Sequence, residues 1–263
     1  MTDAAGPPSA AAAPPSRRLI WQQSRVLDVV DETARVKSLV LRVPGWSGHL
    51  AGQHVDVRLT AEDGYQAQRS YSIASAPASP GAQGDPVVLT VARIDDGEVS
   101  PFLTETLRAG DSLELRGPIG GHFVWTGAAV RPLQLLAGGS GIVPLMAMLR
   151  HRARVAPETP ARLLYSSRTW DAIIYRDELA RLVAADARLS VVHTLTRATP
   201  PGWTGPSRHV DGAMLRQSAF PPGEAPDVFV CGPTPFVEAV ADALVGWGHT
   251  IERIKTERFG PTG

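Results

Sequence analysis

The sequence predicts two domains: an antiparallel β-barrel over residues 17–127, followed by an α/β domain with a doubly wound parallel sheet over residues 128–263. In the first half apolar and polar residues alternate with a period of two, which is typical of strands buried on one face only. In the second half unbroken apolar runs are separated by helical patterns, which indicates parallel strands covered by helices on both faces. A glycine-rich turn joins the first of these runs to the first helical pattern.

The barrel is predicted from several short strands with glycines and prolines between them. The alternating segments are residues 39–43, 54–60, 87–94 and 111–116. One short helix is expected over residues 100–107, with Ser100 as a suitable N-cap and Pro101 as the first helical residue.

The α/β domain is predicted from four apolar runs and three amphipathic helical faces. The runs are residues 133–136, 163–165, 189–192 and 228–230, and the helical faces contain Leu145, Met148 and Leu149, then Leu179, Leu182 and Val183, then Val237, Val240, Ala241 and Leu244. Pro235 begins the last helix, and Gly246 and Gly248 mark its end.

Composition excludes several classes of protein. Among 263 residues, 26 basic and 26 acidic side chains give a formal net charge of zero, so neither nucleic acid nor an anionic membrane is the expected partner. No apolar stretch is long enough for a transmembrane helix. Residues 1–16, rich in alanine and proline, are expected to form a disordered tail because they lack the pattern of a signal peptide.

The chain has one cysteine, Cys231, which cannot form an internal disulfide or complete a four-cysteine cluster. No metal site is expected. A single thiol without a secretory signal fits a reducing, cytoplasmic compartment.

The glycine turn over residues 138–141 has the order strand, turn, helix N-terminus, which suits a dinucleotide pyrophosphate. Gly139, Ser140 and Gly141 are the candidate binding residues, although Pro144 stands where the third glycine of G-x-G-x-x-G would fall. A glycine turn that binds nothing is the alternative.

Two further strand ends in this half are candidates for the same ligand. Ser166, Ser167 and Arg168 end the second strand, and hydroxyls with an arginine favour the 2′-phosphate of NADPH over NADH. Arg176 and Arg197 are also available as cations. A solvated loop, which would leave the preference undetermined, is the alternative. The tripeptide at the end of the fourth strand should face the same crevice; it comprises Cys231, Gly232 and Pro233.

In the barrel, Arg69, Ser70, Tyr71 and Ser72 combine a cation, an aromatic ring and hydroxyls, as a phosphate-bearing planar ring system requires. A strand with an exposed tyrosine and a solvated arginine is the alternative. The segment from Gly97 to Ser100 could present helix N–H groups to a phosphate, or be an ordinary capped helix start.

Together these motifs resemble the ferredoxin–NADP reductase superfamily of flavoproteins over residues 20–263. The matching motifs are R-x-Y-S at residues 69–72, G-x-V-S at 97–100, G-G-S-G-I-x-P at 138–144, C-G-P at 231–233, and the terminal segment 257–263.

The resemblance implies that the barrel binds FAD and that the α/β domain binds NADPH or NADH. It implies that Arg69 binds flavin phosphate, that Tyr71 stacks on the flavin and that Ser72 approaches flavin N5. Ser72, Cys231 beside nicotinamide C4, and Phe259 over the other flavin face would be the catalytic residues. The rest of the flavin site would be lined by Ser70, Val91, Arg93, Gly97, Val99 and Ser100.

The activity implied is hydride transfer from NAD(P)H to FAD, followed by electron transfer to a separate acceptor such as a ferredoxin or flavodoxin. Two alternatives from the same superfamily are a non-catalytic electron-relay subunit and the reductase component of an oxygenase system. A nucleotide-binding scaffold without redox activity is a further alternative.

Overall fold

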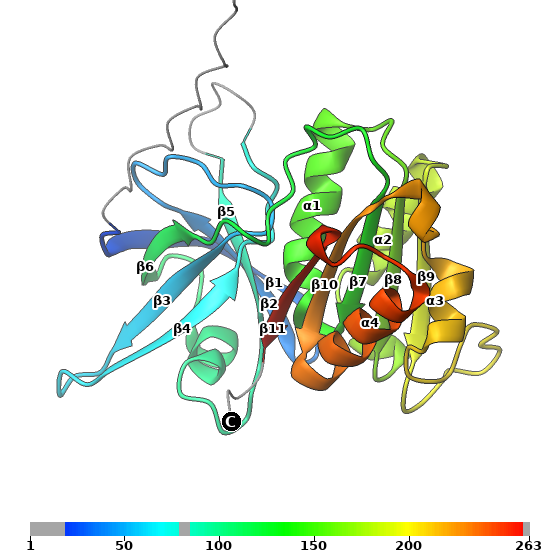
Figure 1. Ribbon diagram of the computed structural model, residues 1–263. Coiled ribbons are helices and arrows are strands. Elements are labelled where there is room, and N and C mark those ends of the chain that lie inside the picture. Colours follow the sequence, from blue (N-terminus) through cyan, green and yellow to red (C-terminus); the bar gives the residue numbers. More distant parts are fainter. Residues whose placement is uncertain (1–18, 79–84, 260–263) are drawn as a thin grey trace, which may run out of the picture.

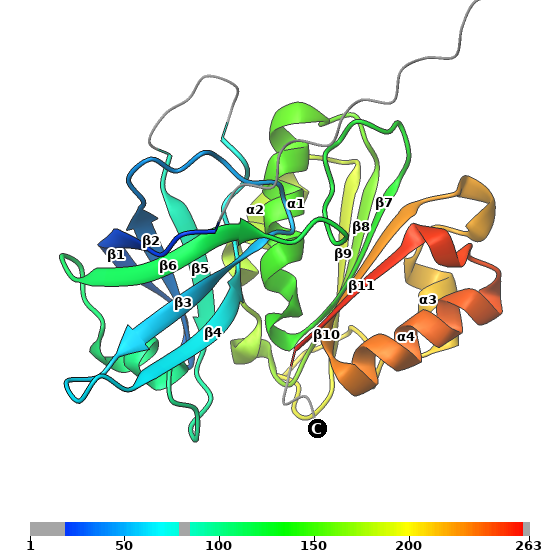
Figure 2. The ribbon, with the colours of Figure 1, turned by 60° about the vertical axis from the view of Figure 1, so that its left-hand side comes forward.

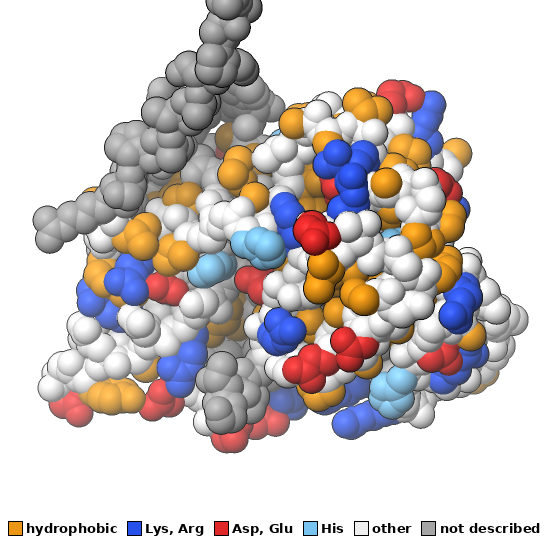
Figure 3. Space-filling model, in the orientation of Figure 1, with side chains coloured by type: hydrophobic (Ala, Val, Ile, Leu, Met, Phe, Trp, Pro, Cys, Tyr) orange, Lys and Arg blue, Asp and Glu red, His pale blue; other side chains and the backbone are white. Residues whose placement is uncertain are grey.

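Two β-sheets, one in each half of the chain, lie side by side in the computed structural model, which describes residues 19–78 and 85–259 (Figure 1). The tail expected over residues 1–16 therefore lies outside the described residues, as does the end of the chain after Phe259. On the face drawn in Figure 3, basic and acidic side chains are interspersed over both halves, in keeping with zero net charge. Within the described ranges no helix is long and apolar enough to span a bilayer.

The N-terminal half is a six-stranded antiparallel sheet with the spatial order β4-β3-β6-β1-β2-β5. Its strands are β1 (Gln22–Thr33), β2 (Val36–Arg42), β3 (His54–Thr60), β4 (Gln66–Ser72), β5 (Val87–Ala92) and β6 (Ser112–Ile119). The sheet curls until its outer edges meet where Ile73 pairs with Leu89. Apolar side chains such as those of Val55 and Val57 fill the interior, so the predicted antiparallel barrel is confirmed.

The helix expected over residues 100–107 is present as η1 (Phe102–Thr106), a π-type turn in which Leu107 N–H donates to Phe102 O at 3.0 Å. The prediction that Ser100 caps it is wrong. The Ser100 hydroxyl accepts instead from Ile94 N–H at 3.0 Å, because the chain folds back on itself in the tight turn before the helix.

The C-terminal half is a five-stranded parallel sheet with the order β11-β10-β7-β8-β9. Its strands are β7 (Leu133–Gly138), β8 (Ala161–Ser167), β9 (Leu189–Leu195), β10 (Asp227–Pro233) and β11 (Ile254–Phe259). The helices are η2 (Gly139–Gly141), α1 (Ile142–Val155), η3 (Trp170–Ala172), α2 (Arg176–Ala185), α3 (Gly212–Ser218), η4 (Pro222–Glu224), α4 (Thr234–Trp247) and η5 (Ile251–Arg253).

Helices cover both faces of this sheet, as predicted (Figure 2). Helices α1 and α2 lie on the face toward the barrel, and α3 and α4 lie on the opposite face. Successive strand residues point to opposite sides, so Leu135 packs with α1 while Leu136 packs with α4. Strand β11 and helix α3 were not among the predicted elements.

The order of the parallel strands places a topological switch point between β7 and β10. The chain runs from β7 to β8 and β9 in one direction, then returns to place β10 on the other side of β7. The segments that leave β7 and β10 therefore diverge at the carboxyl edge of the sheet, which is where ligands bind in open α/β folds.

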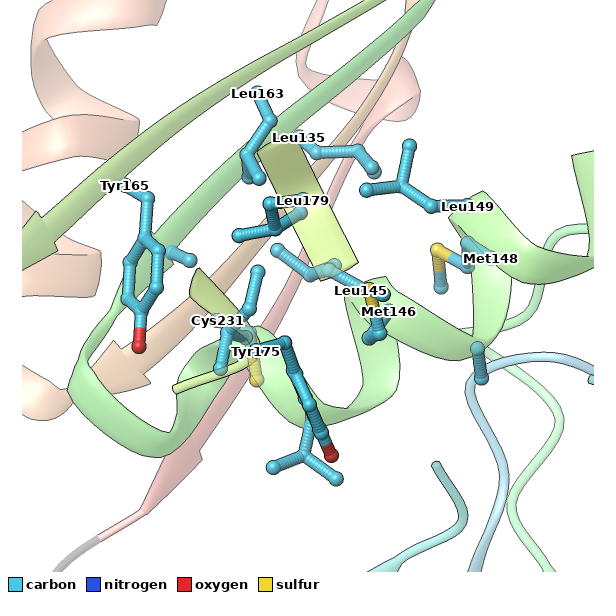
Figure 4. Close-up of a cluster of buried hydrophobic side chains, with 14 of the residues drawn as sticks. Leu135, Leu145, Met146, Met148, Leu149, Leu163, Tyr165, Tyr175, Leu179 and Cys231 are labelled. Atoms are coloured by element: carbon cyan, nitrogen blue, oxygen red, sulfur yellow. The ribbon is translucent and has the colours of Figure 1, made fainter. Parts of the chain in front are cut away.

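The two halves share one apolar core. Val36, Ala51, Ala74, Phe123 and Trp125 of the barrel belong to the same buried cluster as the residues of α1, α2 and the adjoining sheet face. We call this cluster the shared core. Figure 4 shows part of it, in which Tyr175 and Cys231 lie among the buried side chains of α1.

Candidate functional site

The two glycine-containing segments predicted to bind the nucleotide are in contact. A Cβ atom on Gly141 would overlap the carbonyl group of Cys231 and would lie 2.8 Å from Gly232 N. Only glycine lets the turn after β7 approach the end of β10 this closely. The structure thus brings Gly139, Ser140 and Gly141 together with Cys231 and Gly232, as the sequence predicts.

Helix N-termini at this edge are open to an anion. Helices α1 and α4 both begin here without a side-chain cap, whereas α3, elsewhere, is capped by Asp211. Ile142 N–H, the first of α1, already donates to Gly139 O and Ser140 O, and Pro235 near the start of α4 has no N–H, so it is mainly the positive ends of the two helix dipoles that favour an anion here. Gly139 has a φ of 54°, and a Cβ there would meet no atom within 4 Å. Such a cradle fits a dinucleotide pyrophosphate.

The end of β8 adds hydroxyls and cations beside this cradle. Ser166 and Ser167 are buried, and Arg168 is exposed at the edge. Arg197 N–H donates to Arg168 O at 2.9 Å, which places both arginines at the same end of the sheet. Arg176 pairs with Asp177 at 3.3 Å and Asp171 at 3.7 Å, so Arg168 is the more accessible cation.

An aromatic pair that the sequence analysis missed adjoins these cations. The rings of Trp170 and Trp203 meet edge to face with centroids 5.6 Å apart, and the Arg176 guanidinium lies 5.3 Å from the Trp170 ring centre. The sequence does contain a signal for this pair: Trp170 lies two positions after Arg168, at the end of a strand that was already predicted to bind the nucleotide.

Cys231 faces a carboxylate on the neighbouring strand. In the register of β10 and β11 it lies opposite Glu257, and its Sγ is 3.9 Å from Glu257 Oε2. Burial raises the pKa of the Cys231 thiol well above its usual range, so the sulfur stays protonated. Phe259, opposite Pro233 in the same register, packs against the shared core.

Glu257 is a group that sequence reasoning named only as part of a terminal motif. Burial raises its pKa to about 7 from 4.5, so the fold favours the protonated acid. Below pH 4.5 the carboxyl is neutral in both folded and unfolded chains and has no effect. As the pH rises toward 7 the unfolded chain ionises first, so stability is lost across that window.

Glu257→Gln is therefore expected to stabilise the protein at pH 8, relative to its effect at pH 4.5, by on the order of 2 kcal/mol. Urea unfolding of both proteins at the two pH values measures this difference. Glu252→Gln, an exposed carboxyl on η5, is the matched control and should show no such trend. An equal stability difference at both pH values would contradict the prediction.

In the barrel, the two predicted flavin motifs meet through an ion pair. Arg69 Nη2 lies 3.0 Å from Glu98 Oε2, which joins R-x-Y-S on β4 to G-x-V-S before η1. Arg69 and Tyr71 lie on the same face as Val57 and Val55, their cross-strand partners on β3. Tyr71 is half-buried, and burial raises its pKa to about 12, so the phenol remains neutral.

The other predicted flavin residues do not all lie on one face of the barrel. Val91 and Val99 are buried in the barrel core, so their side chains point inward. Arg93 pairs with Asp95 at 3.1 Å and also with Glu105. Ser70 lies on the outer face of β4 and donates to Asp56 at 2.7 Å.

Ser72 ends β4 close to the boundary between the halves. Ala74, two residues later, packs in the shared core together with Cys231. The catalytic residues predicted from separate motifs thus come from segments that border the same cluster. Within residues 19–78 and 85–259, no group of three or more His, Cys, Asp or Glu is arranged to hold a metal ion.

Comparison with known proteins follows the same division of the chain. Residues 26–125 match the family model of the oxidoreductase FAD-binding domain, and residues 135–242 match that of the oxidoreductase NAD-binding domain. The chain belongs to the ferredoxin–NADP reductase superfamily. Its two halves are therefore an oxidoreductase FAD-binding domain and an oxidoreductase NAD-binding domain.

Two relatives and one solved structure illustrate the match. The chain is 32% identical to the glycine betaine monooxygenase reductase subunit of Chromohalobacter salexigens over 90% of its own length, and it spans 64% of that relative. It is 32% identical to NADH-cytochrome b5 reductase 1 of Aspergillus terreus, covering 77% of this chain and 68% of the relative. The FAD/NAD-binding domain of nitric oxide dioxygenase from Vibrio cholerae superposes with a TM-score of 0.80 at 25% identity, covering 91% and 99% of the two chains.

Proposed function

We propose that this reductase takes a hydride from NAD(P)H bound at the carboxyl edge of the parallel sheet and delivers electrons to a separate protein acceptor. FAD, bound to the barrel, would accept the two electrons of the hydride and allow them to leave one at a time. In this proposal residues 17–127 bind FAD and residues 128–263 bind the nucleotide. The observation that supports it best is the contact between Gly141 and Cys231 at the switch point of the sheet, on the side of the shared core.

Each proposed residue has a physical task. Arg69 exchanges Glu98 for a flavin phosphate, and the neutral ring of Tyr71 provides a stacking surface. Gly139, Ser140 and Gly141, with Gly232 and Pro233, hold the pyrophosphate. Because its thiol stays protonated, Cys231 acts as a small neutral wall of the nicotinamide site rather than as a nucleophile. Ser72 and Phe259 border the same region from the barrel side and from β11.

We further propose NADPH as the preferred donor. Ser166 and Ser167 precede Arg168 at the end of β8, where an acidic residue would select the ribose hydroxyls of NADH. The exposed Arg168 side chain has the charge that a 2′-phosphate requires.

For the acceptor, the reductase component of an oxygenase system and a ferredoxin- or flavodoxin-linked reductase are the two candidates. The first is favoured by the similarity to a monooxygenase reductase subunit over 90% of this chain. The single cysteine of this sequence cannot complete an iron–sulfur cluster of the four-cysteine type. A separate protein acceptor is proposed because the relative is named as the reductase subunit of a monooxygenase.

The direct test is anaerobic reduction of the purified FAD-loaded protein by NADPH and by NADH at matched concentration. Bleaching of the flavin absorbance by either donor supports the proposal, and faster bleaching by NADPH supports the assignment of Arg168. Steady-state assays with ferredoxins, flavodoxins and oxygenase components then identify the acceptor. Protein that stays colourless and inactive with added FAD would contradict the enzyme assignment.

Cys231→Ala is expected to slow flavin reduction about tenfold, since removing the sulfur loosens the wall that positions the nicotinamide. FAD content should remain that of the wild type because Cys231 belongs to the nucleotide domain. Stopped-flow absorbance measures the rate. An unaltered rate with full FAD occupancy would count against the placement of Cys231 beside the nicotinamide.

A further inference from the structure

A chain of buried hydroxyl groups crosses from the nucleotide domain into the barrel. Tyr175, the residue before α2, donates its hydroxyl hydrogen bond to Thr90 Oγ1 on β5. Thr90 Oγ1 lies 2.7 Å from Ser38 Oγ on β2, and Ser38 Oγ donates to Glu32 Oε1 on β1 at 2.6 Å. The Tyr175 hydroxyl begins the chain as a donor, those of Thr90 and Ser38 each accept one hydrogen bond and donate one, and the carboxylate of Glu32 ends it.

Tyr175 is held in an uncommon backbone conformation to make this contact. Its φ of 59° and ψ of 25° lie in the left-handed region, where a bulky residue is strained. The side chain is only 3% exposed and packs in the shared core. A strained conformation of this kind persists only where the surroundings determine it strongly.

Arg150 of α1 supports the same contact from the side. Its guanidinium lies 4.9 Å from the centre of the Tyr175 ring and makes two hydrogen bonds to Glu178, at 2.8 and 2.6 Å. It also donates to Ala74 O of the barrel at 2.7 Å. Two polar links, from Tyr175 and Arg150, therefore join the same helix pair to the barrel.

These links lie between the proposed nucleotide site and the proposed flavin site. Tyr175 packs in the same buried cluster as Cys231, and Thr90 directly precedes Val91 in the strand that leads to Arg93. Apolar packing in the shared core is non-directional, so on its own it allows small sliding movements. A directional hydrogen bond at this point restricts them.

We propose that Tyr175 is a positioning residue: its hydrogen bond to Thr90 fixes the orientation of the nucleotide domain against the barrel, and so the approach of nicotinamide to flavin. The inference rests on the proposed function. It assigns to Tyr175 no contact with either cofactor. Its effect is on the rate of hydride transfer, because that rate depends steeply on the separation of the reacting atoms.

Tyr175→Phe and Thr90→Val each remove one hydroxyl and keep the packing. We expect the limiting rate of flavin reduction at saturating NADPH to fall about tenfold, with the nucleotide dissociation constant changed less than about twofold. The double variant should be no slower than Thr90→Val alone, because that change already removes the Tyr175–Thr90 hydrogen bond together with the one between Thr90 and Ser38. Tyr165→Phe is the matched control, since the Tyr165 hydroxyl accepts from Ile174 N–H within the nucleotide domain.

A second readout uses the protein without cofactors. Spin labels on cysteines introduced at the exposed positions Thr106 and Ala180 report the distance between the halves, and the buried Cys231 stays unlabelled. Wild type and Tyr165→Phe should give one narrow distance distribution, and Tyr175→Phe a broader one. A distribution as narrow as the wild type, or a limiting rate within about twofold of it, overturns the proposal. If wild-type flavin is not bleached at all, the proposed function fails instead.

Discussion

Gly141→Ala is expected to abolish NAD(P)H-dependent reduction and to destabilise the protein by about 3 kcal/mol or more. The added methyl group would overlap the carbonyl of Cys231 and approach Gly232 N to 2.8 Å. Both neighbours are backbone atoms of the inner strand β10, which is fixed on both sides by β7 and β11. The strand cannot move aside without breaking its ladder, so the strain falls on the nucleotide cradle.

The matched control for this substitution is Gly139→Ala, two residues earlier in the same turn. Its added methyl group would meet no atom within 4 Å, and only the positive φ of 54° opposes it. We expect a cost of about 1 kcal/mol there. Urea unfolding and stopped-flow reduction of both variants measure the contrast. Equal stability losses at the two positions would show that steric overlap with β10 is not the cause.

Arg152→Ala is expected to cost about 3–5 kcal/mol of stability, because it breaks a buried ion pair. Arg152 is 1% exposed, and its guanidinium pairs with Asp186 at 2.6 Å. It also donates to Thr159 O at 2.5 Å and to Pro157 O at 3.0 Å, joining the end of α1 to the loop before β8. Removing the cation takes a donor from two carbonyl groups and the charged partner from Asp186, whose carboxylate still accepts from Arg188 N–H at 2.9 Å.

Arg188→Ala provides the control for loss of an arginine. Arg188 pairs with Glu158 at 2.5 Å, but both side chains are more than half exposed. Exposed pairs contribute about 0–1 kcal/mol, so this variant should unfold close to the wild type. Urea unfolding midpoints of both variants, measured at pH 7 and at two salt concentrations, distinguish the buried ion pair from the exposed one. A loss at Arg152 no larger than at Arg188 would contradict the assigned role.

Residue periodicity was sufficient to predict both architectures. The alternating segment 54–60 coincides with β3, and the apolar runs of the second half became β7 to β10. The prediction succeeded because these strands have uniform surroundings, either one buried face or two. Strand β11 (Ile254–Phe259) was not predicted, because this edge strand carries three charged residues, is only half-buried and has no continuous apolar run.

The candidate site was predictable where backbone geometry dictates residue type. Gly141 must be glycine because two chain segments touch there. The glycine-rich turn is therefore recognisable in the sequence. Contacts that depend on strand order were not predictable. The pairing of Cys231 with Glu257 and that of Arg69 with Glu98 both require knowing which strands or loops are neighbours. The same holds for Tyr175 and Thr90, whose partnership crosses the two halves.

The change of pattern near residue 127 separates two architectures but does not mark a place where the chain can be cut. Phe123 and Trp125 close the barrel by packing against the nucleotide domain, and Met148 of α1 reaches back to Gly52. A fragment that ends at residue 127 would leave both aromatic rings without a covering surface, and one that begins at residue 128 would expose the barrel-facing side of α1 to water. Using either half as a separate domain would therefore require redesigning the apolar surface that it buries against the other half.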